Sequence, residues 1–221
     1  MRKAIVFDLD GTLVYTLPSL VKSGNEMLKH YSLPPVEAER YRTFLGNGSR
    51  MLVRRLLEQD AAAQAVDEDK ALAIYLKAYE NNCLYSLEAY DAMPEACEEL
   101  KAHGYSLIVL TNKPHPMAVR VMESLYGKDM FDHILGQKVN APVKPDKRLM
   151  QGLVDDLDID PEQSFFVGDS EVDIATAAQV AMPAVAVLWG YRSREQLEAA
   201  GALYLATNAQ DLLRIILEKS A

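Results

Sequence analysis

The chain has 221 residues and a formal charge of −9, from 23 Lys and Arg against 32 Asp and Glu, and its length suits one large domain or one domain with a modest insertion. Hydrophobic residues make up 49% and charged residues 25%, as in soluble globular proteins, which excludes disordered, collagen-like and fibrous classes. The acidic balance, without a dense basic run, excludes broad electrostatic attraction to nucleic acid or to anionic lipid.

The N-terminal segment predicts a buried strand that ends in an acidic turn. The strand is the β-branched, apolar run Ala4–Phe7, and Asp8 and Asp10 follow it. These carboxylates interrupt the run before it reaches the roughly 7–15 apolar residues of a signal peptide. Because the chain also has only two cysteines, Cys83 and Cys97, we expect a cytoplasmic protein without a disulfide framework.

Residues 16–85 predict an all-helical insertion. Roughly 100 residues separate the first strand from the next strand pattern, which is far longer than an ordinary connection in an α/β domain. Apolar residues in this stretch recur at helical spacing, as at Leu52, Leu56 and Leu57. Because ligands of open α/β sheets bind at the carboxyl ends of the strands, the insertion would lie over the binding site.

From residue 86 onward, short apolar strands alternate with helical patterns. The strands are predicted at residues 106–110, 164–167 and 184–188, and the helices at residues 95–103, 117–125, 146–157 and 172–181. The strands are almost continuously apolar, as in parallel sheets covered by helices on both faces. We therefore predict an α/β core, residues 1–15 and 86–221, with residues 16–85 as an inserted helical domain. The longest apolar stretch, residues 180–189, is shorter than the about 18–20 residues that span a bilayer, so no membrane partner is expected.

The first acidic motif, Asp-Leu-Asp-Gly-Thr at residues 8–12, is the strongest chemical signal. Asp8 would end the strand with its carboxylate at the functional edge of the sheet. Gly11 permits a tight turn that brings backbone amides and the Thr12 hydroxyl near an anion. A solvated acidic turn is the alternative, but two carboxylates this close repel each other unless a cation or an acid–base task explains them.

A second acidic motif follows the strand predicted at residues 164–167. Asp169 would lie at the strand end and Asp173 in the first turn of the next helix, so that both face one crevice. Carboxylates grouped in this way suit Mg²⁺, which takes one or two carboxylates, waters and a substrate phosphate. Capping of the helix by its acidic side chains explains the same motif equally well, so both interpretations stay open.

Two further segments supply groups for a phosphate. Thr111 and Asn112 follow the strand predicted at residues 106–110 and offer a hydroxyl and an amide. Lys144 lies between two prolines that restrict its backbone, and it offers a positive point charge. Each residue alone would be an ordinary turn or surface residue, but four clusters of complementary chemistry together indicate a phosphate site.

With these motifs in this order, the sequence resembles the haloacid dehalogenase-like hydrolase superfamily over essentially its whole length. The match comprises the motif at residues 8–12, a hydroxyl residue after the second strand, a lysine, and Gly-Asp-x-x-x-Asp at residues 168–173. Within the family, the chain is most similar to phosphoglycolate phosphatase-like members, partly through Gly-Asn-Gly at residues 46–48 and Leu-Trp-Gly-Tyr at residues 188–191. The resemblance implies a Rossmann-like core with a helical cap inserted after the first motif.

The resemblance also implies phosphoryl transfer through an aspartyl phosphate. Asp8 would be the nucleophile, and Asp10 would act as general acid and then as general base. Mg²⁺ would bind Asp8, the backbone carbonyl of Asp10, and Asp169, with Asp173 reached directly or through water. The acid at position 10 disfavours dehalogenation, because family members that cleave carbon–halogen bonds typically lack it.

The transferring phosphoryl group would be held by Thr111 and Lys144, as the resemblance implies. Thr12 and Asn112 are supporting candidates for substrate binding. Arg50 follows the glycines of the insertion and could pair with a carboxylate or second phosphate of the substrate. The same segment could equally end one helix and cap the next.

The expected function is that of a Mg²⁺-dependent phosphatase for a small phosphorylated metabolite, with phosphoglycolate as the first candidate, acting as a monomer or homodimer. One alternative is a sugar phosphomutase, which shares the aspartyl-phosphate step. Another is a non-enzymatic phospho-acceptor or binding protein. Many relatives carry an acidic residue where this chain has Tyr15, so the resemblance leaves the substrate open.

Overall fold

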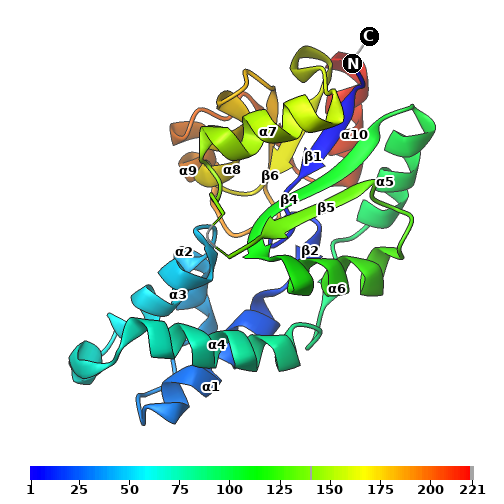
Figure 1. Cartoon of the computed structure of the whole chain (residues 1–221). Coiled ribbons are helices and arrows are strands. Elements are labelled where there is room, and N and C mark those ends of the chain that lie inside the picture. Colours follow the sequence, from blue (N-terminus) through cyan, green and yellow to red (C-terminus); the bar gives the residue numbers. More distant parts are fainter. Residues whose placement is uncertain (140, 220–221) are drawn as a thin grey trace.

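The computed structural model describes residues 1–139 and 141–219, and its main part is a six-stranded sheet (Figure 1). Across the sheet, the strands are β5 (His133–Gln137), β4 (Ser106–Pro114), β1 (Ala4–Phe7), β6 (Phe165–Gly168), β7 (Ala184–Val187) and β8 (Tyr204–Ala206). Every neighbouring pair is parallel, so the carboxyl ends of β1, β4 and β6 meet at one edge. The predicted α/β fold with a parallel sheet is confirmed.

Helices cover both faces of this sheet. They are α5 (Met93–Ala102), α6 (His115–Tyr126), α7 (Lys147–Leu157), α8 (Glu171–Ala178), α9 (Arg194–Ala199) and α10 (Ala209–Lys219), with the short 3₁₀ helix η2 (Pro161–Gln163) before β6. Ile5 and Phe7 pack in one apolar cluster with residues of α5, α6 and α10, whereas Ala4 and Val6 pack in another with residues of α7 and α8. Because successive side chains of a strand face opposite sides, β1 is apolar throughout. None of the helices described here has the length and apolarity needed to cross a bilayer.

Helices α1–α4 form a separate layer beyond the carboxyl ends of the strands (Figure 1). They are α1 (Leu17–His30), α2 (Ala38–Phe44), α3 (Gly48–Leu57) and α4 (Glu68–Asn82), with the 3₁₀ helix η1 (Ala61–Ala65) between the last two. The layer begins after β2 (Val14–Tyr15) and ends before β3 (Glu88–Ala89), and these two strands pair as a short antiparallel ribbon. The limits of a separate domain at residues 16 and 85 stay a prediction.

The helical layer is held together by apolar side chains on the inner faces of its helices. Met27 of α1, Tyr41 of α2, Leu56 of α3 and Tyr75 of α4 are almost completely inaccessible to solvent. The amino end of α4 is capped by Asp67, whose carboxylate accepts hydrogen bonds from two backbone N–H groups of the first turn. These contacts give the layer a fixed shape over the strand ends.

Two edge strands and the end of a third differ from the sequence-based prediction. The residues of β5 are all half-buried and β8 has only three residues, so neither offers the continuous apolar run by which the central strands were recognised. β4 continues to Pro114 after a register shift beyond Leu110. Thr111 and Asn112 therefore lie within this strand and not after it.

We expect Phe131, a buried residue between α6 and β5, to contribute strongly to stability. Its ring meets the rings of Phe7 and Tyr126 edge-on, with centroids 6.1 and 5.4 Å away. Phe131→Ala removes these contacts and leaves a cavity, so the free energy of unfolding in urea should fall by about 3 kcal/mol. The control Leu203→Ala, at a side chain that is 85% exposed, should change it by less than about 0.5 kcal/mol. Equal losses in both variants would contradict this account of the core.

Candidate active site

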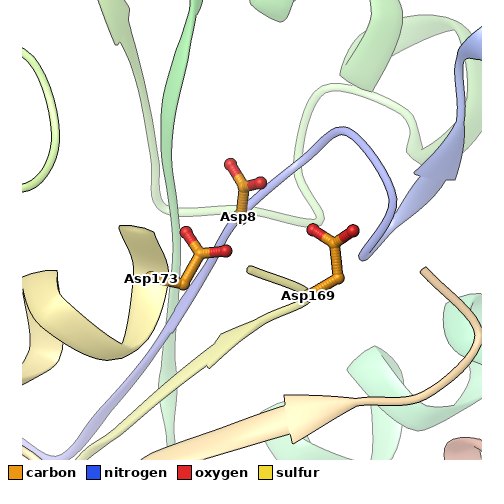
Figure 2. A group of neighbouring side chains, drawn as sticks. All are labelled: Asp8, Asp169 and Asp173. Carbon is orange, nitrogen blue, oxygen red and sulfur yellow. The ribbon is translucent and has the colours of Figure 1, made fainter. Parts of the chain in front are cut away.

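Three aspartates gather at the carboxyl edge of the sheet (Figure 2). Asp8 follows β1, Asp169 follows β6, and Asp173 lies in the first turn of α8. All three are buried, and one carboxylate oxygen of each lies within 4.8 Å of the others. The structure thus brings together the acidic residues of the two motifs, which are far apart in the sequence.

Asp173 caps α8 and is also a member of the acidic cluster, while its role as a metal ligand stays a prediction. Its Oδ2 accepts hydrogen bonds from the backbone N–H and the hydroxyl of Ser170, at 3.0 and 2.6 Å, and so caps α8. Its Oδ1 faces the other carboxylates and accepts a hydrogen bond from Lys144. Gly168 makes this arrangement possible, because a side chain there would collide with the Asp173 carboxyl group. The cap therefore fixes the carboxylate as a member of the acidic cluster.

Lys144 is the cation within this cluster. Its side chain is 2% exposed, and its Nζ donates to Asp8 Oδ1 at 2.8 Å and to Asp173 Oδ1 at 2.7 Å. Asn112 holds the backbone of Lys144 on both sides, because its Oδ1 accepts from the lysine N–H at 2.8 Å and its Nδ2 donates to the lysine carbonyl at 3.1 Å. Burial alone would lower the pKa of Lys144, but Asp173 and Asp8 together raise it. Asn112 thus acts here as a positioning residue for the lysine.

The negative charge of the cluster exceeds what one lysine can balance. Burial raises the pKa of the Asp8 carboxyl to about 6, with further contributions from Asp173 and Asp10, while Lys144 acts in the opposite direction. Burial also raises the pKa of Asp169 well above its usual value, and Asp173 and Asp8 add to this. A cation bound among these oxygens would relieve the repulsion. A set of buried carboxylate ligands fits Mg²⁺.

Asp10 lies beside the cluster with different partners. Its Oδ1 accepts hydrogen bonds from Lys113 Nζ and from the Thr16 hydroxyl, both at 2.6 Å. Its side chain is 20% exposed, so it reaches the solvent-accessible part of the site. Lys113 is a residue that the sequence analysis did not select, although it directly follows Thr111 and Asn112. The sequence feature that could have identified it is its place as the third polar residue in a row after a buried apolar run.

Both predicted threonines are buried, but they stand in different places. Thr111 lines the cleft, and its hydroxyl accepts a hydrogen bond from the backbone N–H of Lys113 at 3.2 Å. The Thr12 hydroxyl donates to Asp169 Oδ1 at 3.5 Å, which places Thr12 behind the acidic cluster. The structure therefore brings Thr111 to the surface of the cleft and ties Thr12 to a candidate metal ligand.

Arg50 lies away from this cleft, so the structure gives no support to the substrate-binding role predicted for it, which stays a prediction. Its guanidinium donates to Glu68 at 3.2 Å and to Asp69 at 2.7 Å, at the start of α4. The side chain is 51% exposed, and Arg50 is not among the residues that line the cleft. The pairing of α3 with the acidic first turn of α4 explains its position.

The cleft lies between the strand ends and the helical layer and has a cavity volume of about 50 Å³. Its apolar wall comes from the helical layer and comprises Leu20, Leu45, Leu52, Tyr75 and Tyr79. Arg192, after β7, connects the two parts by donating to the backbone carbonyls of Arg42 and Leu45, both at 2.8 Å, and it also pairs with Glu171. Asn112 makes a second connection through its Nδ2, which donates to the Gly46 carbonyl at 2.9 Å.

Comparisons with known proteins agree with this arrangement of residues. A family model described as haloacid dehalogenase-like hydrolase matches residues 5–187. The chain is 35% identical to the phosphoglycolate phosphatase of Rhodospirillum rubrum, with 92% of this chain and 86% of that protein covered. It is 34% identical to the phosphoglycolate phosphatase of Mesorhizobium japonicum, with coverages of 89% and 87%.

A solved structure shows the same likeness over almost the whole chain. A crystal structure of a predicted phosphoglycolate phosphatase from Haemophilus somnus superposes with a TM-score of 0.88 at 31% identity, and the match covers 97% of each chain. The similarity therefore extends over the sheet and the helical layer alike.

We expect a divalent cation to stabilise the protein through the acidic cluster. Mg²⁺ at about 100 times its dissociation constant should stabilise the folded state by about 2.7 kcal/mol, measured as a rise in melting temperature over a sample with chelator. Asp169→Asn removes a candidate ligand and should abolish most of that rise. Asp156→Asn, which changes an exposed acid of α7, is the matched control and should keep it. Equal rises in the wild type and Asp169→Asn would place the cation elsewhere.

The raised pKa of Asp8 predicts a pH dependence of stability in the metal-free protein. Because the pKa of this carboxyl is about 6 in the folded protein, against its ordinary value of 3.8, the unfolded chain loses the proton first as the pH rises between these values. The ionising group therefore lowers stability over this window. Asp8→Asn has no proton to release, so its stability relative to wild type should increase across the window by on the order of 1–3 kcal/mol. Urea unfolding with chelator at several pH values measures this difference, and a constant difference would contradict the assignment.

Proposed function

The chain belongs to the haloacid dehalogenase-like hydrolase family and is a phosphatase, and on this premise we propose that it is Mg²⁺-dependent and works through an aspartyl phosphate at Asp8. The substrate is a small phosphorylated metabolite, with phosphoglycolate as the first candidate because phosphatases of that compound are its relatives. The observation that carries the proposal is the convergence of Asp8, Asp10, Lys144 and Asp169 at one edge of the sheet.

In the first step, the Asp8 carboxylate attacks phosphorus, and the bond from phosphorus to the leaving oxygen breaks. Lys144 holds Asp8 in place through its 2.8 Å hydrogen bond and lies where it can also balance charge on the transferring group. Mg²⁺ would be held by Asp8, the backbone carbonyl of Asp10, Asp169 and Asp173. When bound, it offsets the repulsion between an attacking carboxylate and an anionic phosphate.

Asp10 handles the protons of both steps. It donates a proton to the leaving oxygen in the first step and removes one from water in the second. That water attacks the phosphorus of the aspartyl phosphate, which releases inorganic phosphate and restores the Asp8 carboxylate. The hydrogen bonds from Lys113 and Thr16 hold Asp10 beside the cleft, where a leaving group would stand.

The predicted phosphate-binding residues divide into contacts and positioning residues. The Thr111 hydroxyl lines the cleft and would bind a phosphoryl oxygen, together with Lys144. Asn112 contributes by fixing the backbone of Lys144, and Thr12 by its hydrogen bond to Asp169. With these roles, the proposed reaction at the site stays the same as the one predicted from the sequence.

Residues 16–85 would serve as a cap domain over the reaction. The apolar side chains of the helical layer form one wall of the cleft, and Tyr75 and Tyr79 stack with ring centroids 5.7 Å apart. An apolar wall excludes water from the attack by Asp8 and strengthens the electrostatic contacts of the phosphoryl group. A small substrate suits a cleft of this size.

Release of phosphate from 2-phosphoglycolate tests the proposal directly. The wild type should release phosphate with Mg²⁺ and lose this activity with chelator. Asp8→Asn should lower kcat by at least about a thousandfold, because the nucleophile is gone. The control Asp156→Asn should match the wild type.

The covalent intermediate has its own readout. Borohydride reduces an acyl phosphate to an alcohol, so reduction of the wild type during turnover should produce homoserine at position 8 in the mass spectrum. Full activity of a folded Asp8→Asn variant, or modification at another carboxyl group, would overturn the proposed mechanism. Formation of an isomer without phosphate release would instead identify a phosphomutase.

A further inference from the structure

Lys113 is a buried cation to which the mechanism above gives no task of its own. Its side chain is 1% exposed, and its Nζ lies 2.6 Å from Asp10 Oδ1 and 4.9 Å from the centre of the Tyr79 ring. A buried ammonium is unfavourable unless it is paired, and a lysine carries three N–H donors. Among the described residues, this ammonium donates a hydrogen bond to Asp10 alone. It therefore has donors to offer to a ligand.

The other cations of the site already donate hydrogen bonds to several acceptors each. Lys144 donates to Asp8 and Asp173, within the acidic cluster. Arg192 lines the cleft, but its guanidinium already donates hydrogen bonds to Glu171 and to two backbone carbonyls of the helical layer. Lys113 is consequently the cation of the cleft with the most donors free: its ammonium makes one hydrogen bond, whereas that of Lys144 makes two and serves the phosphoryl side.

The position of Lys113 identifies the part of a substrate that it would meet. Asp10 acts on the leaving oxygen, so the ammonium bonded to Asp10 stands on the leaving-group side of the cleft and not on the phosphoryl side. The helical layer contributes an apolar wall to this cleft, with Leu20, Leu52 and Tyr79, and the Tyr79 ring is the part of that wall nearest to the ammonium. An anionic group near the leaving oxygen would find one complementary charge there, in an environment of low dielectric that strengthens the contact.

We propose that Lys113 is the specificity-determining residue of this enzyme, and that its ammonium binds a carboxylate carried by the leaving alcohol. The inference rests on the proposed function and narrows its substrate class to phosphate esters of 2-hydroxy acids, in which a single carbon separates the leaving oxygen from the carboxylate. Asp10 carries the proton that it donates in the first step, so the single positive charge of the ammonium balances the substrate carboxylate where it is buried, while the hydrogen bond to Asp10 keeps the ammonium in place.

A pair of substrates of similar size separates this role from a merely structural one. 2-Phosphoglycolate carries the carboxylate, whereas 2-hydroxyethyl phosphate carries a neutral hydroxymethyl group in its place. The wild type should prefer the former in kcat/KM by at least about tenfold, since a buried site built for a charged group discriminates strongly against its absence. In Lys113→Met this preference should fall to near one. Lys113→Arg keeps the charge and should retain much of it.

Two controls accompany the measurement. Lys147→Met removes an exposed lysine of α7 and should leave the preference at the wild-type value. Lys113→Gln is a second neutral variant, which replaces Lys113→Met if thermal melting shows that the latter is not folded. p-Nitrophenyl phosphate, whose leaving group carries no charge before cleavage, reports phosphatase chemistry independently of carboxylate binding.

The outcomes separate the inference from the function on which it rests. An equal loss of kcat/KM for both substrates in the neutral variants would show that Lys113 acts only through Asp10 and would overturn the inference. Turnover of p-nitrophenyl phosphate by a wild type without preference for 2-phosphoglycolate would overturn it as well, while leaving the phosphatase intact. Failure of the wild type on all three esters would overturn the proposed function and the inference together.

Discussion

The mutual repulsion of buried carboxylates around one lysine is the constraint on which the site depends. Asp8, Asp169 and Asp173 share a space in which the oxygens lie within 4.8 Å, and Lys144 is the cation that the described part of the chain brings among them. Such an arrangement is unfavourable by itself and persists because the surrounding backbone fixes each member. In the function proposed above, a cation relieves this excess of negative charge and allows a phosphate to bind beside the carboxylates.

The parallel sheet supplies that fixed backbone. β1 and β6 are neighbours in space although more than half the chain separates them, and their carboxyl ends carry Asp8 and Asp169 side by side. The start of α8 adds Asp173 through its cap, and Asn112 at the end of β4 sets the loop that carries Lys144. Each group thus has a separate local cause, and the topology makes them one site.

The central part of this arrangement could be predicted from the sequence because its signals are local. The apolar run before Asp8 and the one before Asp169 mark strands covered on both faces, and a polar residue at the end of such a strand has to lie at the edge of the sheet. β5 and β8 gave no comparable signal, since β5 is only half-buried along its length and β8 has only three residues. Arg50 and Lys113 show the limit of such predictions from opposite sides. Arg50 was selected because its charge follows two glycines, but in the structure it pairs with Glu68 and Asp69 in the first turn of α4. Lys113 was not selected, because its ion pair with Asp10 joins the ends of two strands that are far apart in the sequence. Whether two distant residues pair depends on the folded structure, so it cannot be predicted from the sequence of one segment alone.

The link that Arg192 makes between sheet and helices has a consequence for how such proteins can diverge. Its acceptors at positions 42 and 45 are main-chain carbonyls, which every amino acid possesses. Substitutions at these two positions can therefore alter the side chains around the cleft mouth while the attachment survives. This attachment of the helical layer to the sheet therefore places no demand on the side chains at the two positions, and Leu45, which lines the cleft, can change without loss of the contact.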